Sequence, residues 1–334
     1  MPAAVLHFRR AVANGNGLKV ADPFQPSSSP GEQQVLRRVA LAGALGNMGD
    51  LEGESEHLHK VLRAAPGHIH ARLSLGQNLF QRGKIDESIP EFLMALQLPN
   101  TGPGKVPDAH SESLIRRQAL RKLTYMYGQR ANLSAGHGRH EDAVEQLQKL
   151  TALLRTNLQA DAWLACDEQE TASEHLLTTH ASTDQQHTTA AVFGGDGRPI
   201  TDSSETLKIV LDLVRSEANL AASLLELNDV PGARTALSRA HKALECHPQA
   251  RKDSKMLSRL QYEEAKGKER EGDVAVEAAS TDAERAHAAT LHTEAKELYR
   301  ASHRTFADKA AQQGFVRVQA KAHPDMEFVI DERM

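Results

Sequence analysis

Histidine is the residue type through which this chain could most readily bind a metal, because the sequence contains 17 of them. The most plausible cluster is His57 and His59 together with His68 and His70. Residues two positions apart on a helix point to different sides, so His57 and His59 are poorly placed to bind one tetrahedral ion. No cysteine lies near them to complete a zinc site. We therefore expect solvated histidines on helical surfaces, with no metal and no cofactor.

Motifs for catalysis are missing from the sequence. It contains no Gly-x-Ser-x-Gly, no GxxxxGK[ST], no HExxH, and no dinucleotide-binding fingerprint after a strand. Gly194-Gly-Asp-Gly197 has no strand before it and no helix directly after it, so we interpret it as a loop. Carboxylate pairs such as Glu263-Glu264 lie among lysines and arginines, as on a solvated helix face. We expect a protein that is not an enzyme.

Composition narrows the fold class and the partners. Hydrophobic residues make up 40% of the chain but aromatics only 4%, which favours helices with a Leu, Ala and Val core. The net charge is −4 with both signs interspersed, which argues against nucleic-acid binding. No apolar run approaches the roughly 20 residues of a membrane helix. Cys166 and Cys246 are far apart in a chain too large to need a disulfide, so we expect free thiols and a cytoplasmic protein.

Two consecutive stretches, 35–68 and 69–102, fall into register at a period of 34 residues. The matched pairs are Gly49-Asp50 with Gly83-Lys84, Leu45 with Leu79, Leu58 with Phe92, Val61 with Ala95, and Ala42 with Gly76. Pro66 closes the first stretch. A period of this length indicates stacked supersecondary units.

This pattern resembles the tetratricopeptide repeat, which has small residues at positions 8 and 20, large apolar ones at 11 and 24, Ala at 27 and Pro at 32. Glu54 and, more mildly, Ser88 depart from it, both at position 20. The resemblance implies an all-α, right-handed solenoid of helical hairpins with two irregular insertions. Successive units of such an array pack only on their neighbours.

Following the register along the chain predicts its organisation. The segments are 1–13, a half-repeat helix; 14–31, a loop; 32–102, two repeats; 103–123, an insertion or extra helix; 124–157, a third repeat; 158–201, a mostly flexible insertion; 202–248, a long helix and fourth repeat; 249–318, a long helical hairpin; and 319–334, a tail. The hairpin at 249–318 could be a divergent repeat or a cap of the array, and the sequence leaves both interpretations open. Within it we expect one helix over 282–313, with the alternating residues from Phe315 onward read as part of a tail. Pro90 is tolerated if its helix begins near Asp86.

The half-repeat resembles the second helix of a unit whose first helix is missing. Ala4, Phe8 and Ala11 match positions 20, 24 and 27, and Val5, Phe8 and Val12 form an apolar stripe. Leaving that stripe in water would cost about 1.5–3 kcal/mol for each large side chain. We expect it to pack on the next repeat; alternatively, the chain is part of a longer array.

In the tetratricopeptide family, the first helices of successive repeats line a concave groove that binds a partner peptide or helix. Carried over by position, the resemblance implies a groove of Val39 and Asn47 from the first repeat; His70, Leu73, Gln77, Phe80 and Gln81 from the second; Tyr125 and Asn132 from the third; and Arg215, Asn219 and Glu226 from the fourth. Phe80 could anchor a partner or could pack against the inserted helix, and the sequence leaves both open.

The function that this resemblance implies is a non-catalytic scaffold or adaptor whose partners are proteins, with neither nucleic acid nor membrane bound and the oligomeric state open. One alternative is the repeat portion of a larger transferase or hydroxylase. Another is a co-chaperone that binds a chaperone tail, because Asn219 resembles the central asparagine of that carboxylate clamp. The next helix offers Arg259 and Glu263 where the clamp needs two basic residues, which counts against this alternative.

Overall fold

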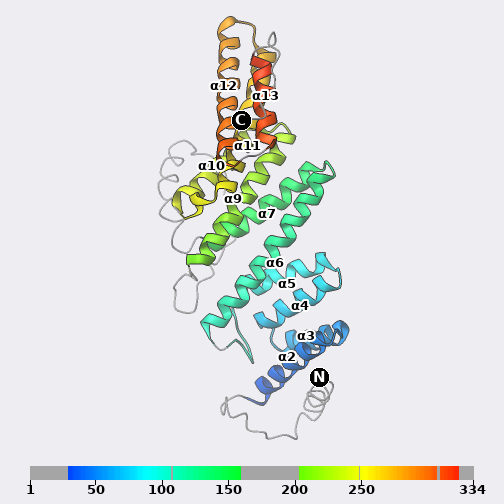
Figure 1. The fold of residues 1–334 in the computed structure, drawn as a ribbon. Coiled ribbons are helices and arrows are strands. Elements are labelled where there is room, and N and C mark those ends of the chain that lie inside the picture. Colours follow the sequence, from blue (N-terminus) through cyan, green and yellow to red (C-terminus); the bar gives the residue numbers. More distant parts are fainter. Residues whose placement is uncertain (1–28, 107, 159–202, 248, 307–308, 323–334) are drawn as a thin grey trace, which may run out of the picture. The chain divides into compact units, whose positions relative to one another are not determined.

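The computed structural model describes residues 29–106, 108–158, 203–247, 249–306 and 309–322, and these residues form helices without a strand. The helices, labelled as in Figure 1, are α2 (Pro30–Asn47), α3 (Leu51–Ala64), α4 (Ile69–Gln81), α5 (Ile85–Gln97), α6 (Ala109–Gly136), α7 (His140–Leu158), α9 (Ser203–Glu226), α10 (Val230–Cys246), α11 (Ser254–Ala278), α12 (Asp282–Thr305) and α13 (Lys309–Ala322), with a 3-10 turn at Ala250–Lys252. The predicted all-α class is confirmed. The half-repeat at 1–13, almost all of the loop at 14–31 and almost all of the insertion at 158–201 lie outside the described residues.

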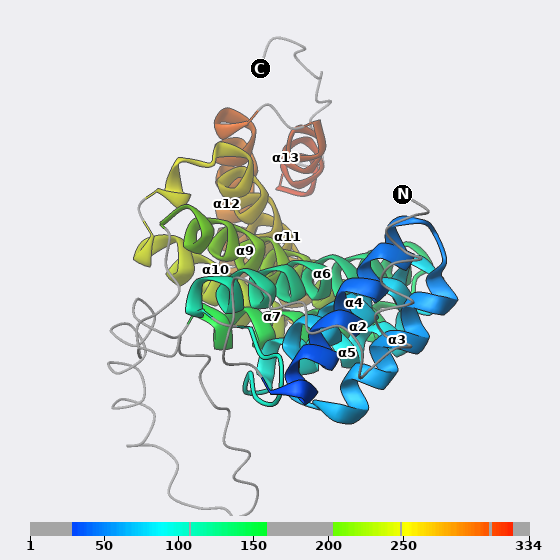
Figure 2. The same ribbon diagram turned by 90° about the horizontal axis from the view of Figure 1, so that it is seen from below.

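The helices group into two compact units. The first contains α2 to α5 and α6 up to Met126, and the second contains the rest of α6 with α7 and α9 to α13. Consecutive helices pack as hairpins, α2 on α3, α4 on α5, α9 on α10 and α11 on α12, and each hairpin packs on the next within its unit. Within the first unit, α2 to α5 lie side by side in both views (Figures 1 and 2). The helical-hairpin architecture is therefore confirmed as well.

The two matched repeats have equivalent glycine turns but different helix starts, because Lys84, which matches Asp50, makes no side-chain cap to α5. Gly49 and Gly83 have φ values of +80° and +74°, a left-handed conformation that glycine adopts without strain. The Asp50 side chain caps α3 by accepting a hydrogen bond from the Gly53 N–H at 2.9 Å. At the start of α2, Ser29 and Glu32 form a reciprocal capping box. Local sequence signals thus account for where these helices begin and end.

Close packing explains the small residue at position 8. A Cβ atom on Gly76 would lie 3.0 Å from the Phe92 ring, which is fully buried between α4 and α5. Residues of α2, α3 and α4 form a shared apolar cluster. Its buried members are Val35, Ala42, Leu58, Val61, Leu62, Ala71, Leu75 and Leu79.

Specific contacts accommodate each of the two departures from the repeat pattern. A Cβ atom on Gly46 would lie 2.7 Å from the Glu54 carboxyl group, so the glycine provides the room that this large residue needs. Asn78 donates to the Glu54 carboxylate at 2.8 Å and to the Leu51 carbonyl at 2.7 Å. Ser88 is buried, and its hydroxyl donates to the Ile85 carbonyl at 2.8 Å.

Some boundaries differ from those that the sequence predicts. The sequence predicts a boundary between an inserted helix that ends near 123 and a repeat that starts at 124. In the structure this position lies inside the uninterrupted helix α6. In contrast, the helix that contains Pro90 begins at Ile85, within one residue of the expected start near Asp86. The helix expected over 282–313 instead ends at Thr305, and α13 then includes residues interpreted as a tail.

Apolar and polar residues alternate after Gly314, and from the sequence this pattern is interpreted as a tail. The same apolar residues also fit a helical spacing, and they lie in α13. Ala311, Phe315 and Val318 lie four and three residues apart and bury one face of α13. That face joins Ala295 and Tyr299 in the core of the second unit. Tertiary packing therefore decides the structure of this segment.

Cys246, at the end of α10, is disulfide-bonded, so the expectation that it is a free thiol is wrong. Cys166 lies outside the described residues. The argument from free thiols for a reducing compartment is therefore removed. The cytoplasmic location stays a prediction. None of the described helices is both long enough and apolar enough to span a membrane.

Candidate functional site

The first unit brings two of the predicted groove residues into direct contact. Phe80, near the end of α4, and Tyr125, on α6, meet edge to face with ring centroids 6.2 Å apart and an interplanar angle of 79°. The Lys122 ammonium lies 5.3 Å from the centroid of the Phe80 ring. Tyr125 is 55% exposed, whereas Phe80 is half-buried. Packing of Phe80 against α6 is therefore observed, and it leaves an aromatic surface open to solvent beside a cation.

The other predicted residues of α4 divide by burial. His70 and Gln81 are exposed and Gln77 is half-buried, so their polar groups can reach a partner. Leu73 is only 3% exposed and offers no surface. Asn47 is exposed at the end of α2.

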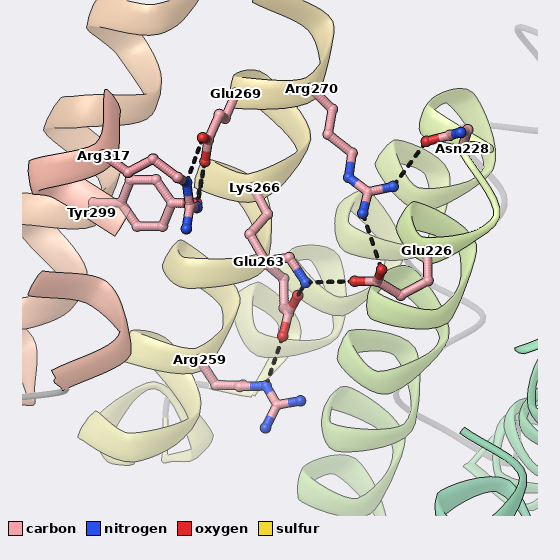
Figure 3. A network of polar contacts seen from close by, with 9 residues as sticks. All are labelled: Glu226, Asn228, Arg259, Glu263, Lys266, Glu269, Arg270, Tyr299 and Arg317. Atoms are coloured by element: carbon pink, nitrogen blue, oxygen red, sulfur yellow. Dashed lines mark hydrogen bonds and ion pairs between the residues drawn. The ribbon is translucent and has the colours of Figure 1, made fainter. Parts of the chain in front are cut away.

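In the second unit, Asn219 and Glu226 of α9 contact a row of cations on α11, and Figure 3 shows the contacts of Glu226. Arg259 donates to the Asn219 side-chain oxygen at 3.2 Å. Lys266 and Arg270 donate to the two carboxylate oxygens of Glu226 at 3.2 and 3.1 Å. These three cations lie seven and four residues apart, as expected for one face of a helix.

Glu263 lies within this row of cations and is buried. It accepts from Arg259 at 3.1 Å, while its other oxygen is 3.7 Å from the Lys266 ammonium. Burial raises the pKa of Glu263, and the two cations oppose that change. The cations of this row already pair with groups of the chain itself, so an incoming carboxylate would have to displace those groups, which argues against the chaperone-tail alternative.

A separate set of polar contacts holds α13 (Figure 3). The Glu269 carboxylate accepts from the Arg317 guanidinium at 2.7 and 2.6 Å and from the Tyr299 hydroxyl at 2.9 Å. Glu269 is buried and Tyr299 is fully buried. No sequence motif reveals this cluster, because its residues come from three different helices.

The remaining predicted positions show fewer contacts across helices. Arg215 is exposed and pairs with Asp212 of its own helix at 2.9 Å. Asn132 is exposed on α6. The structure thus connects Phe80 with Tyr125, and Asn219 and Glu226 with α11, within their respective units.

Of the histidines considered for a metal site, His68 differs from the expectation of a solvated side chain. His68 is buried and caps α4, its Nδ1 accepting a hydrogen bond from the Ala71 N–H at 3.2 Å. His68 and His70 have ring centroids 6.4 Å apart. Among the described residues, no group of three or more His, Cys, Asp or Glu side chains could hold a metal ion.

Comparison with known proteins gives matches among solved structures alone. No family model and no curated protein matches the chain. The matching structures include the TPR2AB domain of yeast Sti1 in complex with pHSP90, with 15% identity, coverage of 86% of this chain and 99% of that chain, and a TM-score of 0.22. They also include the TPR domain of P58(IPK), with 14% identity, coverage of 98% and 96%, and a TM-score of 0.21. Both TM-scores are low, so neither match indicates a function for this chain.

Proposed function

We propose that the chain is a non-catalytic scaffold that binds a protein partner, as a peptide or a helix, on the first-helix surface of its first unit. The observation that carries this proposal is the aromatic pair of Phe80 and Tyr125, which is in contact yet accessible. Aromatic side chains supply large contact areas at protein interfaces and lose little conformational entropy on binding.

The chemistry around the aromatic pair suggests what a partner would present. An apolar side chain would pack on Tyr125 and the free edge of Phe80. The Lys122 ammonium, which lies over the Phe80 ring, could at the same time pair with an acidic group of the partner. An apolar residue next to an acidic one therefore fits this surface.

Polar groups along α4 would fix the register of the partner. Gln77 precedes Gln81 by four residues, and His70 lies seven residues before Gln77, so all three follow the same side of α4. Amide and imidazole groups at this spacing can bond to the main chain of an extended peptide or to polar side chains of a helix.

The second unit contributes less to binding in this proposal. Asn219 and Glu226 already accept hydrogen bonds from α11, so a partner would have to replace those bonds to use these residues. Replacing one set of hydrogen bonds by another yields little net free energy. We therefore assign the anchor to Phe80 and Tyr125.

The test is capture of partners from a cell lysate by the native chain and by the double variant Phe80→Ala, Gln77→Ala. The matched control is Leu114→Ala, Gln97→Ala, which truncates an exposed leucine and an exposed glutamine elsewhere in the first unit. We expect the first double variant to lose a partner that the control retains, with unchanged helicity by circular dichroism. Equal capture by both variants would refute the groove assignment.

A further inference from the structure

The hairpin of α11 and α12 presents an aromatic side chain at one of its ends. Phe306 directly follows α12 and is 43% exposed. The Lys255 ammonium, in the first turn of α11, lies 5.4 Å from the centroid of the Phe306 ring. Thr305 donates to the Gln261 side chain at 3.1 Å, which holds the end of α12 beside α11. We call the surface made of Arg251, Lys252, Lys255, Arg304 and Phe306 the basic end of the hairpin.

The cations of the basic end differ from the other cations of the same two helices. Among the described residues, no carboxylate lies within ion-pair distance of Lys252, Lys255 or Arg304, and all three are exposed. Arg251 lies 3.8 Å from Glu245, and both of these side chains are more than half exposed. The positive charge of the basic end is therefore available to an incoming anion.

Elsewhere in the hairpin most cations already bind carboxylates. The pairs are Arg259 with Glu263, Lys266 and Arg270 with Glu226, Lys268 with Glu294, Arg285 with Asp282, and Arg300 with Glu297. Unpaired positive charge thus gathers around the exposed aromatic ring.

Exposed cations beside an aromatic ring favour an acidic protein segment as the ligand. Carboxylates of such a segment would form charge-assisted hydrogen bonds with the lysines and arginines. An apolar side chain between the carboxylates would pack on Phe306, and aromatic residues and arginine are the types that carry most binding energy at interfaces. We infer that the basic end binds a segment of a partner protein in which an apolar side chain is flanked by carboxylates.

Two other anionic ligands fit the basic end less well. A membrane surface would meet the carboxylates of Asp253 and Glu245 together with the cations, and one phenylalanine adds little apolar area to membrane binding. Single-stranded nucleic acid is bound by several stacking aromatic rings along a basic groove. Among the described residues of the second unit, Phe306 is the single exposed aromatic. A discrete protein segment therefore matches this surface best.

The basic end is separate from the surface that carries the proposed function. Phe306 and Lys255 belong to the second unit, and the aromatic pair on α4 and α6 belongs to the first. The chemistry is similar, since a lysine ammonium also lies over the Phe80 ring at 5.3 Å. With both surfaces, the chain can bind two acidic segments, and each surface can be tested without the other.

The test is a fluorescence-anisotropy titration of the full chain with a labelled pentapeptide, one leucine between two pairs of glutamates. Every chain in the titration carries Phe80→Ala and Lys122→Gln, so that the surface of the first unit does not contribute. Adding Lys255→Glu and Phe306→Ala to this background should weaken binding about tenfold or more. Raising the salt concentration should weaken binding to the background chain, because exposed charges are screened.

The matched control adds Arg285→Glu and Val274→Ala to the same background. These substitutions change one exposed cation and one exposed apolar residue at the opposite end of the hairpin, and they should leave the affinity unchanged. Circular dichroism of each variant checks that helicity is retained. A pentapeptide with lysines in place of the glutamates should not bind.

Three results would overturn the inference. The first is equal affinity of the two added pairs of substitutions for the acidic pentapeptide, and the second is no binding of this pentapeptide to the background chain. The third is binding of phosphatidylserine vesicles or of an oligothymidylate that depends on Lys255 and Phe306 when binding of the pentapeptide does not. None of these results bears on Phe80 and Tyr125, whose role is tested by partner capture.

Discussion

Glu54 shows how one large residue can occupy a position that normally holds a small one. Its carboxylate lies against Gly46 and accepts from Asn78. The sequence reveals the departure at Glu54, but the compensation by Asn78 could not be predicted because that residue lies 24 positions away. A compensating pair such as Glu54 and Asn78 depends on side-chain geometry, which cannot be predicted from the spacing of residues in the sequence.

The first prediction concerns the charge of Glu54. Burial raises the pKa of Glu54, and the hydrogen bond from Asn78 lowers it by less. A raised folded-state pKa means that the ionised form is disfavoured by folding, so at neutral pH the charge reduces stability. Glu54→Gln keeps an acceptor for Asn78 and removes the charge. We expect a higher midpoint of urea unfolding at pH 7.

The control for this prediction is Glu52→Gln, because Glu52 is exposed on the same helix. Its substitution should leave the midpoint unchanged. A lower midpoint for Glu54→Gln than for the native chain would show that the carboxylate charge is stabilising.

The second prediction follows from His68. Burial lowers the pKa of His68, with a smaller contribution from nearby His70, so folding favours the neutral ring. The neutral form is also the one that can accept the hydrogen bond from Ala71. Its contribution to stability should be present above the unfolded pKa, about 6.5, and lost as the pH falls below it.

To isolate this effect, urea unfolding of the native chain is compared with that of His68→Asn at pH 7.5 and pH 5.5. Asparagine can cap the helix without titrating. We expect the native chain to lose more stability between the two pH values than the variant, because the other histidines titrate in both proteins. An equal loss would remove His68 as the cause.

At the scale of the elements, the sequence predicts helices well where the 34-residue register is strong, and less well at the C-terminal end. The glycines at the turns and the small residues at position 8 are local signals. In contrast, α13 depends on packing against Tyr299, which lies on another helix. A local sequence pattern cannot predict such a contact.

The third prediction concerns the attachment of α13. Arg317 pairs with Glu269 through two hydrogen bonds, and Glu269 is buried. Arg317→Ala would remove both of these hydrogen bonds, while the Tyr299 hydroxyl would keep its bond to the carboxylate (Figure 3). Because the Arg317 side chain is half-exposed, we expect a modest loss of about 1 kcal/mol.

The measurement is urea unfolding together with hydrogen exchange of α13, with Arg304→Ala as the control because Arg304 is exposed at the end of α12. Faster exchange in α13 should accompany Arg317→Ala alone. Unchanged exchange would show that the apolar contacts of Ala311, Phe315 and Val318 hold the helix without the ion pair.

At the scale of the whole molecule, the candidate site was predictable where it depends on repeat position alone. Position identified Phe80 and Tyr125, which meet in the first unit. It also selected Leu73, which is buried, and did not reveal Lys122 or the pairing of Glu226 with α11. A repeat pattern specifies the direction of a side chain, whereas its neighbours determine whether it stays available to a partner.

The fourth prediction concerns how destabilisation spreads along the array. Each hairpin packs on the next within its unit, so a local defect should act mainly on its neighbours. Phe92 is fully buried, and Phe92→Ala should cost about 3–5 kcal/mol through lost burial and a cavity. We expect faster hydrogen exchange in α3, α4 and α5, with α11 and α12 nearly unaffected.

The reciprocal variant completes this experiment. Tyr299→Ala removes a fully buried side chain from the second unit and should accelerate exchange in α11, α12 and α13, while α4 and α5 keep their protection. If either substitution accelerated exchange equally in both units, the chain would unfold as a single cooperative body. Separate responses would mean that partner binding on α4 can stabilise the first unit without requiring a change in the second.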